Sequence, residues 1–487
     1  MTDFTALSLS EQLAALNDGL ITSVALTQAY LDNIQRLNPT LNSYITVTQE
    51  DALIQAAAAD NDRIHGRIAP LLGLPLGIKD VLSTKGIETT CASNILRGYV
   101  PVFDATAVAR LKAAGALILG KLNMDEFAMG SSNENSAFGL CRNPWDIDRV
   151  PGGSSGGSGV AVAAGLCAGA LGTDTGGSVR LPASYCGITA MKPSYGRVSR
   201  WGLIAYGSSL DSIGTMGRTV EDTARLLQVI AGHDPKDSTS MPLDVPNYLE
   251  ALEGGVKGLK IGVPEEYFGE GIAAETAHAV RTAIAALEQQ GATVHPVKMP
   301  MTEYCLPAYY LIATSEASSN LARYDGIRFG NLQDQGEMWD TYRVTRGEGF
   351  GDEVKLRIML GTYALSAGYY DAYYGKAQAV RTLIKRDFDN AFEQVDVLIT
   401  PVAPDVAFKI GENISDPLQM YLADVLSVSA NLAGVAALAL PCGFSSSGLP
   451  IGMQIFSKAF NESAAFRVGA AYQAITDWHT QRPTVLL

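Results

Sequence analysis

Two clusters of glycine and serine enclose a short apolar segment and restrict how this part of the 487-residue chain can fold. The clusters read GGSSGGS at 152–158 and GTDTGGS at 172–178. Between them, the small apolar residues 159–166 predict a buried helix, and 167–171 predict a core strand. The strand therefore ends directly in the second cluster, at a sharp turn that can expose a reactive serine above a sheet.

Helical and strand-like segments alternate along much of the remaining sequence. Strands are predicted at 71–82, 116–120, 260–263, 293–297, 395–400, 437–441 and 451–456. Helices are predicted up to Pro39 and at 105–114, 273–290 and 463–477, and 234–258 is expected to be a surface connection. This alternation predicts an α/β protein.

Composition narrows the class of function. With 47% apolar and 18% charged residues the chain can bury a sizeable core, and a net charge of −14 argues against a chain that binds nucleic acid by itself. No apolar run reaches the length of a membrane span and no targeting segment is recognised, so the expected location is the cytoplasm. The cysteines lack metal-site or disulfide spacing and are expected to be reduced core thiols; Asp146 and Asp148 are too few for a metal site.

No histidine lies near either cluster, which points to serine chemistry with a base other than imidazole. Lys79 is the candidate, because it lies in the apolar run 71–82. Burial lowers the pKa of a lysine and makes it a general base near neutral pH. Two alternatives remain open: Lys79 pairs with Asp80, or its side chain reaches outward to solvent.

Ser178 is the candidate nucleophile, since it ends the turn 175–178. The two glycines of that turn let successive N–H groups point at one spot, which is what an oxyanion requires. A tight turn or a phosphate-binding loop would also use such glycines, but no Gly-Lys-Ser or Gly-Lys-Thr follows either cluster.

Three segments resemble the amidase signature family: 77–80, 152–157 and 172–183. The resemblance implies one domain over 1–487, with a large mixed β-sheet covered by helices on both faces, a helical segment at 1–68 and an inserted strand-helix-strand region at about 245–330. It implies that Ser178 attacks an amide, that Ser154 bridges on a cis peptide bond, and that Lys79 is the base. The oxyanion hole would comprise the N–H groups of Thr175, Gly176, Gly177 and Ser178.

Two further segments, 309–326 and 355–361, resemble one branch of that family, the A subunits of aspartyl/glutamyl-tRNA amidotransferases. The substrate would then be glutamine. By resemblance, Asp424 takes its ammonium group and Tyr309 lines the site, and Arg357 can form a forked contact with its carboxylate. Asp174 and Arg180 are interpreted as a buried pair that stiffens the nucleophile turn, and Ser155 as structural support.

The same resemblance implies a division of labour between subunits. This chain would hydrolyse glutamine and pass ammonia to B and C subunits in a heterotrimer, where ATP, Mg²⁺ and the mischarged Glu-tRNA(Gln) or Asp-tRNA(Asn) are bound. It would carry no cofactor or metal of its own. Two alternatives stay open: a stand-alone amidase for another small amide, and a catalytically silent scaffold or nucleotide-binding subunit whose glycine clusters only bind a ligand.

Overall fold

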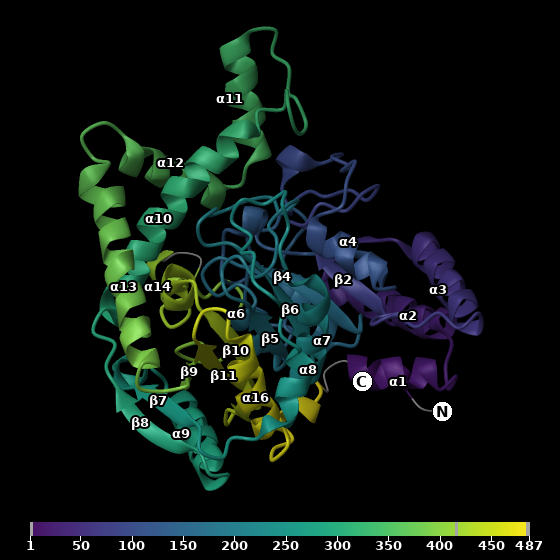
Figure 1. Ribbon diagram of the computed structural model, residues 1–487. Helices are drawn as coiled ribbons and strands as arrows, with labels where there is room; N and C mark the ends of the chain where they lie inside the picture. Colours follow the sequence, from purple (N-terminus) through teal and green to yellow (C-terminus); the bar gives the residue numbers. More distant parts are fainter. Residues whose placement is uncertain (1–2, 414–416, 484–487) are drawn as a thin grey trace.

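A single mixed sheet of 11 strands forms the centre of the computed structural model, which describes residues 3–413 and 417–483 (Figure 1). The strand order is β1-β3-β2-β4-β6-β5-β10-β11-β9-β7-β8. The strands are β1 (Tyr44–Val47), β2 (Pro75–Lys79), β3 (Leu117–Leu122), β4 (Gly169–Asp174), β5 (Thr189–Lys192), β6 (Ser212–Gly217), β7 (Lys260–Pro264), β8 (Thr293–Val297), β9 (Val397–Pro401), β10 (Ala436–Phe444) and β11 (Pro450–Ser457).

Strands β3, β2 and β4 run parallel to one another, as do β8, β7 and β9, whereas the remaining neighbours are antiparallel. The carboxyl ends of parallel strands meet at one edge of a sheet, where ligands of α/β proteins usually bind. Lys79 ends β2 and Asp174 ends β4, so this edge brings the lysine close to the second glycine-serine cluster.

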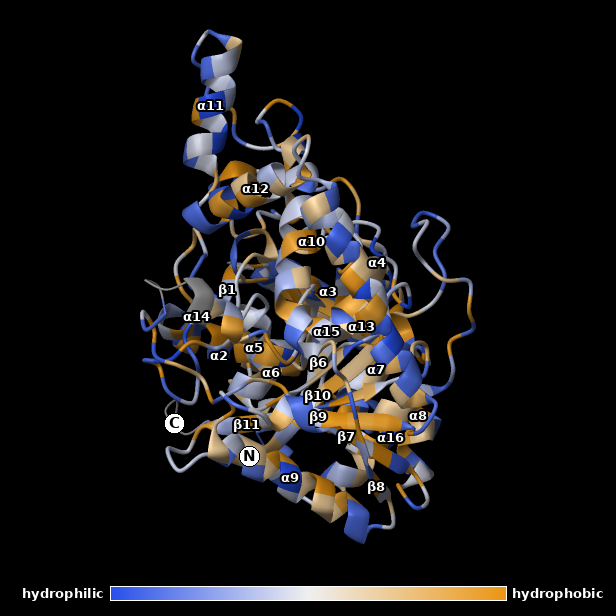
Figure 2. Cartoon of the chain, turned by 90° about the vertical axis from the view of Figure 1, so that its left-hand side faces the viewer, coloured by the Kyte–Doolittle hydropathy of each residue, from blue (hydrophilic) through white to orange (hydrophobic). Residues whose placement is uncertain are grey.

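Both faces of the sheet are covered. Successive side chains of a strand point to opposite faces, yet every residue of β2 to β6 and of β9 and β11 is buried. Figure 2 shows apolar residues concentrated along the central strands. The helices are α1 (Leu9–Asn17), α2 (Ser23–Leu41), α3 (Gln49–Ile64), α4 (Thr106–Ala113), α5 (Gly156–Ala163), α6 (Arg180–Cys186), α7 (Val220–Ile230), α8 (Tyr248–Ala251), α9 (Ala274–Gln289), α10 (Cys305–Asn320), α11 (Met338–Gly349), α12 (Asp352–Leu365), α13 (Lys376–Phe392), α14 (Pro417–Leu422), α15 (Val428–Ala433) and α16 (Glu462–Gln473).

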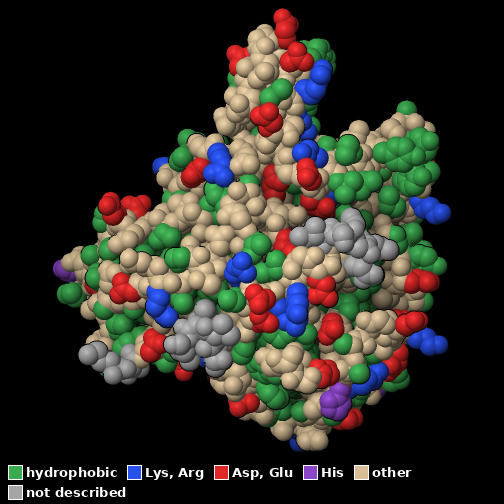
Figure 3. Space-filling model, turned by 180° about the vertical axis from the view of Figure 1, so that it is seen from behind, with side chains coloured by type: hydrophobic (Ala, Val, Ile, Leu, Met, Phe, Trp, Pro, Cys, Tyr) green, Lys and Arg blue, Asp and Glu red, His purple; other side chains and the backbone are tan. Residues whose placement is uncertain are grey.

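The helices that follow β8 and precede β9 in the sequence form a layer beside the sheet. In this layer α10 packs against α12 and α13, and also against α15, which follows β9. Helix α11 projects from this layer at the top of Figure 1. Seen from behind, hydrophobic side chains gather at the far end of α12 and at the turn into α13 (Figure 3). Exposed residues there are Met359, Leu360, Tyr363, Tyr369 and Tyr370.

The α/β class predicted from the alternation is confirmed, with two local differences. Helix α2 continues to Leu41 and includes Pro39, because a proline in the last turn removes only one backbone hydrogen bond and Asn42 ends the helix at φ 50°. The connection predicted at 234–258 contains the short helix α8. The boundaries of the proposed domain and its insertion stay predictions.

The thiols agree with the prediction, since all six cysteines are buried and free. Within residues 3–413 and 417–483, no helix is long and apolar enough to cross a bilayer. In the same residues no group of three or more His, Cys, Asp or Glu side chains is arranged to hold a metal ion.

Candidate active site

Lys79 lies at the end of β2 with its side chain completely buried. Its Nζ donates to three hydroxyl oxygens, those of Ser154 at 2.7 Å, Ser155 at 2.9 Å and Thr173 at 2.9 Å. The alternative of a pair with Asp80 is not observed. Asp80 follows on the opposite side of the chain, where it lies 3.3 Å from the Nζ of Lys121.

Burial is the dominant influence on the charge of Lys79. It lowers the pKa of the amine to about 7, against the raising influence of the carboxylates of Asp125, Asp174 and Asp211. Near neutral pH a large share of Lys79 is therefore uncharged. The uncharged amine has two N–H donors and one lone pair, so one of its three hydroxyl contacts becomes one in which the nitrogen accepts, and through it the amine can take up the hydroxyl proton.

The two candidate serines lie on neighbouring loops at the same sheet edge. The peptide bond between Gly153 and Ser154 is cis. The N–H of Ser155 donates to the carbonyl of Ser178 at 3.2 Å, which holds the two serine loops together. Ser154 is fully buried, whereas Ser178 is 8% exposed and its hydroxyl has no hydrogen bond among the described residues. Ser178 is thus the serine that an incoming substrate can reach.

The turn that precedes Ser178 offers unoccupied backbone donors. Within the described residues, the N–H groups of Thr175, Gly176 and Ser178 have no hydrogen-bond acceptor. Gly177 differs from the expectation, because its N–H donates to the Asp174 carboxylate at 2.9 Å. Its φ of 138° is a conformation open to glycine. The turn can therefore accommodate an oxyanion with donors other than the Gly177 N–H.

The predicted pair of Asp174 and Arg180 is present and buried, with the carboxylate 3.0 Å from the guanidinium. Burial is the largest influence and raises the pKa of Asp174, but the charge and hydrogen bonds of Arg180, together with Lys192 and Asn431, outweigh it and lower the pKa to about 2. All five N–H donors of Arg180 are used, by Asp174, the Ser427 carbonyl, Asn431 and Gln454. The start of α6 is thereby fixed directly after the candidate nucleophile.

Two of the three residues predicted to recognise the substrate border this turn, and the third contacts a neighbour of theirs. The ring of Tyr309, on α10, packs so closely on Gly176 that a Cβ there would lie 2.5 Å from it. A Cβ on Gly177 would lie 3.8 Å from a carboxylate oxygen of Asp424. The guanidinium of Arg357, on α12, lies over the ring of Tyr310, the residue that follows Tyr309.

Arg357 is surrounded by aromatic rings and keeps one acidic partner. Its guanidinium carbon lies 5.7, 5.3 and 5.4 Å from the ring centroids of Tyr206, Tyr310 and Tyr421. Glu353, one turn earlier on α12, lies 2.7 Å away, and the guanidinium donates to the Tyr206 hydroxyl at 2.8 Å. The cation is thus held in one orientation, which suits a planar, two-point contact with a carboxylate.

Asp424 is a buried carboxylate with two hydroxyl donors. Ser131 donates to it at 2.5 Å and Tyr310 at 3.4 Å. Burial raises its pKa to about 7, opposed by the hydrogen bond from Ser131 and by the charge of Arg357. The structure thus places one cation over the ring of Tyr310 and one anion at its hydroxyl.

Comparison with known proteins identifies the family. The family model described as Amidase matches residues 25–466. The chain belongs to the amidase family. It is 59% identical over 99% of its length to the A subunit of the glutamyl-tRNA(Gln) amidotransferase of Roseiflexus sp. (strain RS-1), and 57% identical over 99% to that of Chloroflexus aggregans; both alignments also cover 99% of the relative.

Solved structures of the family are similar over nearly the whole chain. The A subunit of the glutamyl-tRNA(Gln) amidotransferase of Thermotoga maritima has a TM-score of 0.79 at 42% identity, and the match covers 97% of this chain and 95% of the relative. A 6-aminohexanoate cyclic dimer hydrolase bound to substrate has a TM-score of 0.87 at 28% identity, with both chains fully covered. Proteins named for different substrates thus share this fold.

The sequence did not single out several residues of this amidase site. Thr173 lies in the segment 172–183 that carries the family resemblance, yet its contact with Lys79 follows only from the pairing of β2 with β4. Tyr206 and Ser131 lie in loops far from the site residues in sequence, and nothing in their sequence surroundings identifies them. Tyr310 had one signal, its position directly after Tyr309.

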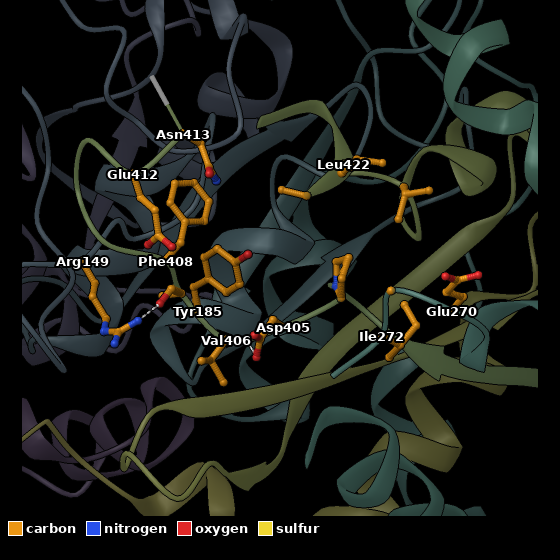
Figure 4. A pocket seen from close by; sticks show the side chains of 15 residues that line it. Arg149, Tyr185, Glu270, Ile272, Asp405, Val406, Phe408, Glu412, Asn413 and Leu422 are labelled. Carbon is orange, nitrogen blue, oxygen red and sulfur yellow. Dashed lines mark hydrogen bonds between the residues drawn. The ribbon is translucent and has the colours of Figure 1, made fainter. Parts of the chain in front are cut away.

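A cavity of about 510 Å³ adjoins the segment that carries Asp424 (Figure 4). Ala423 and Val425, the neighbours of Asp424, line it, as does the ring of Tyr185. Arg149 faces it and donates to the carbonyl of Ala407. None of Lys79, Ser154 and Ser178 lines this cavity, so it is separate from the candidate amidase chemistry.

Proposed function

We propose that this amidase is the glutaminase component of a tRNA-dependent amidotransferase, in which it releases ammonia from glutamine for transfer to a misacylated tRNA. One observation carries the proposal: a desolvated lysine amine lies 2.7 Å from the Ser154 hydroxyl, and a buried Arg357 and a buried Asp424 both contact Tyr310, whose neighbour Tyr309 packs on the nucleophile turn. The lysine and serine supply the chemistry of amide hydrolysis. Arg357 complements the carboxylate of an amino acid, and Asp424 complements its ammonium group.

The first half of the reaction forms an acyl-enzyme. Uncharged Lys79 accepts the proton of Ser154 while Ser154 accepts that of Ser178, and the Ser178 oxygen attacks the side-chain carboxamide carbon of glutamine. Negative charge then develops on the carboxamide oxygen. The unoccupied N–H groups of Thr175, Gly176 and Ser178 stabilise it, each such donor typically contributing about 3 kcal/mol.

The second half reverses the proton path. The proton held by Lys79 returns through Ser154 to the departing nitrogen, and the C–N bond breaks. Ammonia leaves, and a glutamyl ester remains on Ser178. Water then gives its proton to the same pair and attacks the ester. Glutamate is released and all three side chains return to their starting protonation states.

Substrate choice rests on charge spacing. Arg357 binds the α-carboxylate, Asp424 binds the α-ammonium, and Tyr309 forms the wall of the site next to Gly176. An amide that lacks either charge loses the contact with Arg357 or with Asp424, which weakens its binding. Glutamine therefore binds in preference to a simple amide.

The remaining steps belong to partners. B and C subunits complete a heterotrimer in the cytoplasm, and the partner holds ATP, Mg²⁺ and the mischarged Glu-tRNA(Gln) or Asp-tRNA(Asn). The net charge of −14 supports this arrangement, because a chain with an excess of carboxylates is a poor anchor for phosphates. No cofactor is needed for the hydrolysis assigned to this chain.

The test is a glutaminase assay of the purified chain with and without co-purified partner subunits. Ser178→Ala, Ser154→Ala and Lys79→Ala should each lower kcat by at least about 100-fold, the usual effect of losing a nucleophile or a proton carrier. A serine-directed phosphonate should label the wild type and not Ser178→Ala. Thr382→Ala, at an exposed hydroxyl on α13, is the matched control and should keep full activity.

Two outcomes would contradict the proposal. Hydrolysis of small amides without preference for glutamine, unchanged by any partner, would favour a stand-alone amidase. Absence of both turnover and phosphonate labelling in every preparation would favour a catalytically silent scaffold.

A further inference from the structure

The loop after β3 contacts both halves of the site through one residue, Ser131. Its backbone carbonyl accepts the N–H of Gly153 at 2.7 Å, next to the candidate relay serine. Its hydroxyl donates to Asp424 at 2.5 Å. The side chain is 1% exposed, so water does not compete for either contact.

We propose that Ser131 is a positioning residue for substrate selection, whose hydroxyl holds the Asp424 carboxylate in the orientation that receives the α-ammonium of glutamine. This inference rests on the proposed function and assigns a role to a residue that does not itself touch the substrate. The hydroxyl contact and the carbonyl contact are separable, because a change of side chain leaves the backbone carbonyl in place.

The surroundings of Asp424 explain why this one hydroxyl matters. Both donors share one carboxylate oxygen, and Tyr310 is the weaker of the two at 3.4 Å. The backbone of Asp424 is fixed separately, since its carbonyl accepts the backbone N–H of Ser427 at 2.9 Å. The hydroxyl of Ser427 donates to the Gly176 carbonyl at 2.5 Å, which ties the segment to the nucleophile turn.

The other carboxylate oxygen of Asp424 lies on the side of that turn, 3.8 Å from where a Cβ of Gly177 would be. Ser131 therefore determines which oxygen remains available and where it points. Without its hydroxyl, the carboxylate is free to rotate about its side-chain bonds while the backbone keeps its place. The expected loss is in recognition of the ammonium group, with the proton relay unaffected.

The experiment compares two substrates in Ser131→Ala: glutamine, and 4-carbamoylbutanoate, which is glutamine without its amino group. KM for glutamine should rise about tenfold, the typical effect of removing a hydrogen bond to a buried charge. kcat for glutamine should change by less than about twofold, and kcat/KM for 4-carbamoylbutanoate should stay within about twofold of the wild type, since that substrate makes no use of Asp424.

Ser132→Ala is the matched control. Ser132 is the next residue, equally buried, and its hydroxyl accepts only the N–H of Glu134 at 3.3 Å among the described residues. Ser132→Ala should leave the ratio of kcat/KM for glutamine to kcat/KM for 4-carbamoylbutanoate unchanged. Ser131→Cys, which keeps the size and a weak donor, should give an intermediate KM for glutamine and provides a second variant if the alanine form does not fold.

A double-mutant cycle completes the test. In an Asp424→Asn background, Ser131→Ala should add no further loss with glutamine, because the group that it orients has already lost its charge. Equal losses for both substrates, or additive losses in the cycle, would overturn the inference and assign Ser131 to the scaffold of Ser154. Failure of the wild type to hydrolyse glutamine would instead contradict the proposed function.

Discussion

At the scale of single residues, the site depends on two ionisable groups whose pKa values burial brings to about 7 from opposite directions. Burial lowers the pKa of the Lys79 amine from its usual range and raises the pKa of the Asp424 carboxyl from its usual range. The first must be uncharged to accept a proton and the second must be charged to bind an ammonium ion. The share of molecules that meets both requirements therefore rises as the pH increases through about 7.

This arrangement predicts an acid limb in the pH profile of glutamine hydrolysis. As the pH falls through about 7, Lys79 gains its proton and kcat falls, while Asp424 is neutralised and KM rises. The limb of kcat/KM should therefore be steeper than that of kcat. Initial rates on both sides of neutral pH check this, with Asp424→Asn as control: its KM should lose the pH dependence. A maximum rate on the acid side of neutral would contradict the prediction.

The triad residue types were available from sequence, but their contacts were not. A lysine in an apolar run indicated an abnormal amine, and only the paired strands reveal that its partners are three hydroxyls and not Asp80. The sequence does not tell which N–H the Asp174 carboxylate takes, and the structure gives it that of Gly177, so the make-up of the oxyanion hole stays a prediction. The roles of Arg357, Asp424 and Tyr309 came from the resemblance and stay predictions.

At the scale of elements, α12 sets the position of Arg357 through close packing on α10. Gly361 faces the backbone of α10 so tightly that a Cβ there would lie 1.9 Å from the Thr314 carbonyl oxygen. A side chain at this position must push the two helices apart. The guanidinium one turn earlier on α12 would move with the helix.

Gly361→Ala is therefore expected to raise KM for glutamine and to lower the free energy of unfolding by about 1–3 kcal/mol, although it alters no group that touches substrate. Urea unfolding and steady-state kinetics measure both effects. Gly347→Ala on α11 is the control, because no atom lies within 4 Å of a Cβ there. It should leave KM unchanged and should stabilise the helix by up to about 1 kcal/mol. Equal effects of the two substitutions would disprove the packing argument.

The elements differ in how well sequence reveals them. Buried strands such as β7 and β9 were identified to within two residues, because short apolar runs between polar turns are distinctive. The register and order of the strands could not be identified from the sequence, because strands far apart in the chain pair with one another. For example, β5 pairs with β10 across more than 240 residues. No assignment was made for the helical layer from α10 to α13, whose faces are set by contacts with one another.

At the scale of the whole molecule, Arg180 connects segments that are far apart in the chain. It joins β4, α15 and β11 by five hydrogen bonds, and both it and Asp174 are completely buried. Removing one partner of such a pair leaves a charge in the interior without compensation.

We expect Arg180→Met to lower the free energy of unfolding by about 3–5 kcal/mol and to abolish glutamine hydrolysis. Chemical denaturation followed by fluorescence gives the first quantity. Arg281→Met removes the partner of Glu265 in a surface pair at 2.8 Å, and it should cost no more than about 1 kcal/mol. A similar loss in the two variants would show that the buried network adds nothing to stability.

The carbonyl of Asp174 is bound by Asn431, and that of Gly176 by Ser427. A ribosome makes residues 174–178 some 250 positions before it reaches Ser427 and Asn431, so the emerging polypeptide carries its attacking serine for most of translation without the groups that shape the turn around it. The turn therefore gains these two supports only after most of the polypeptide has been made.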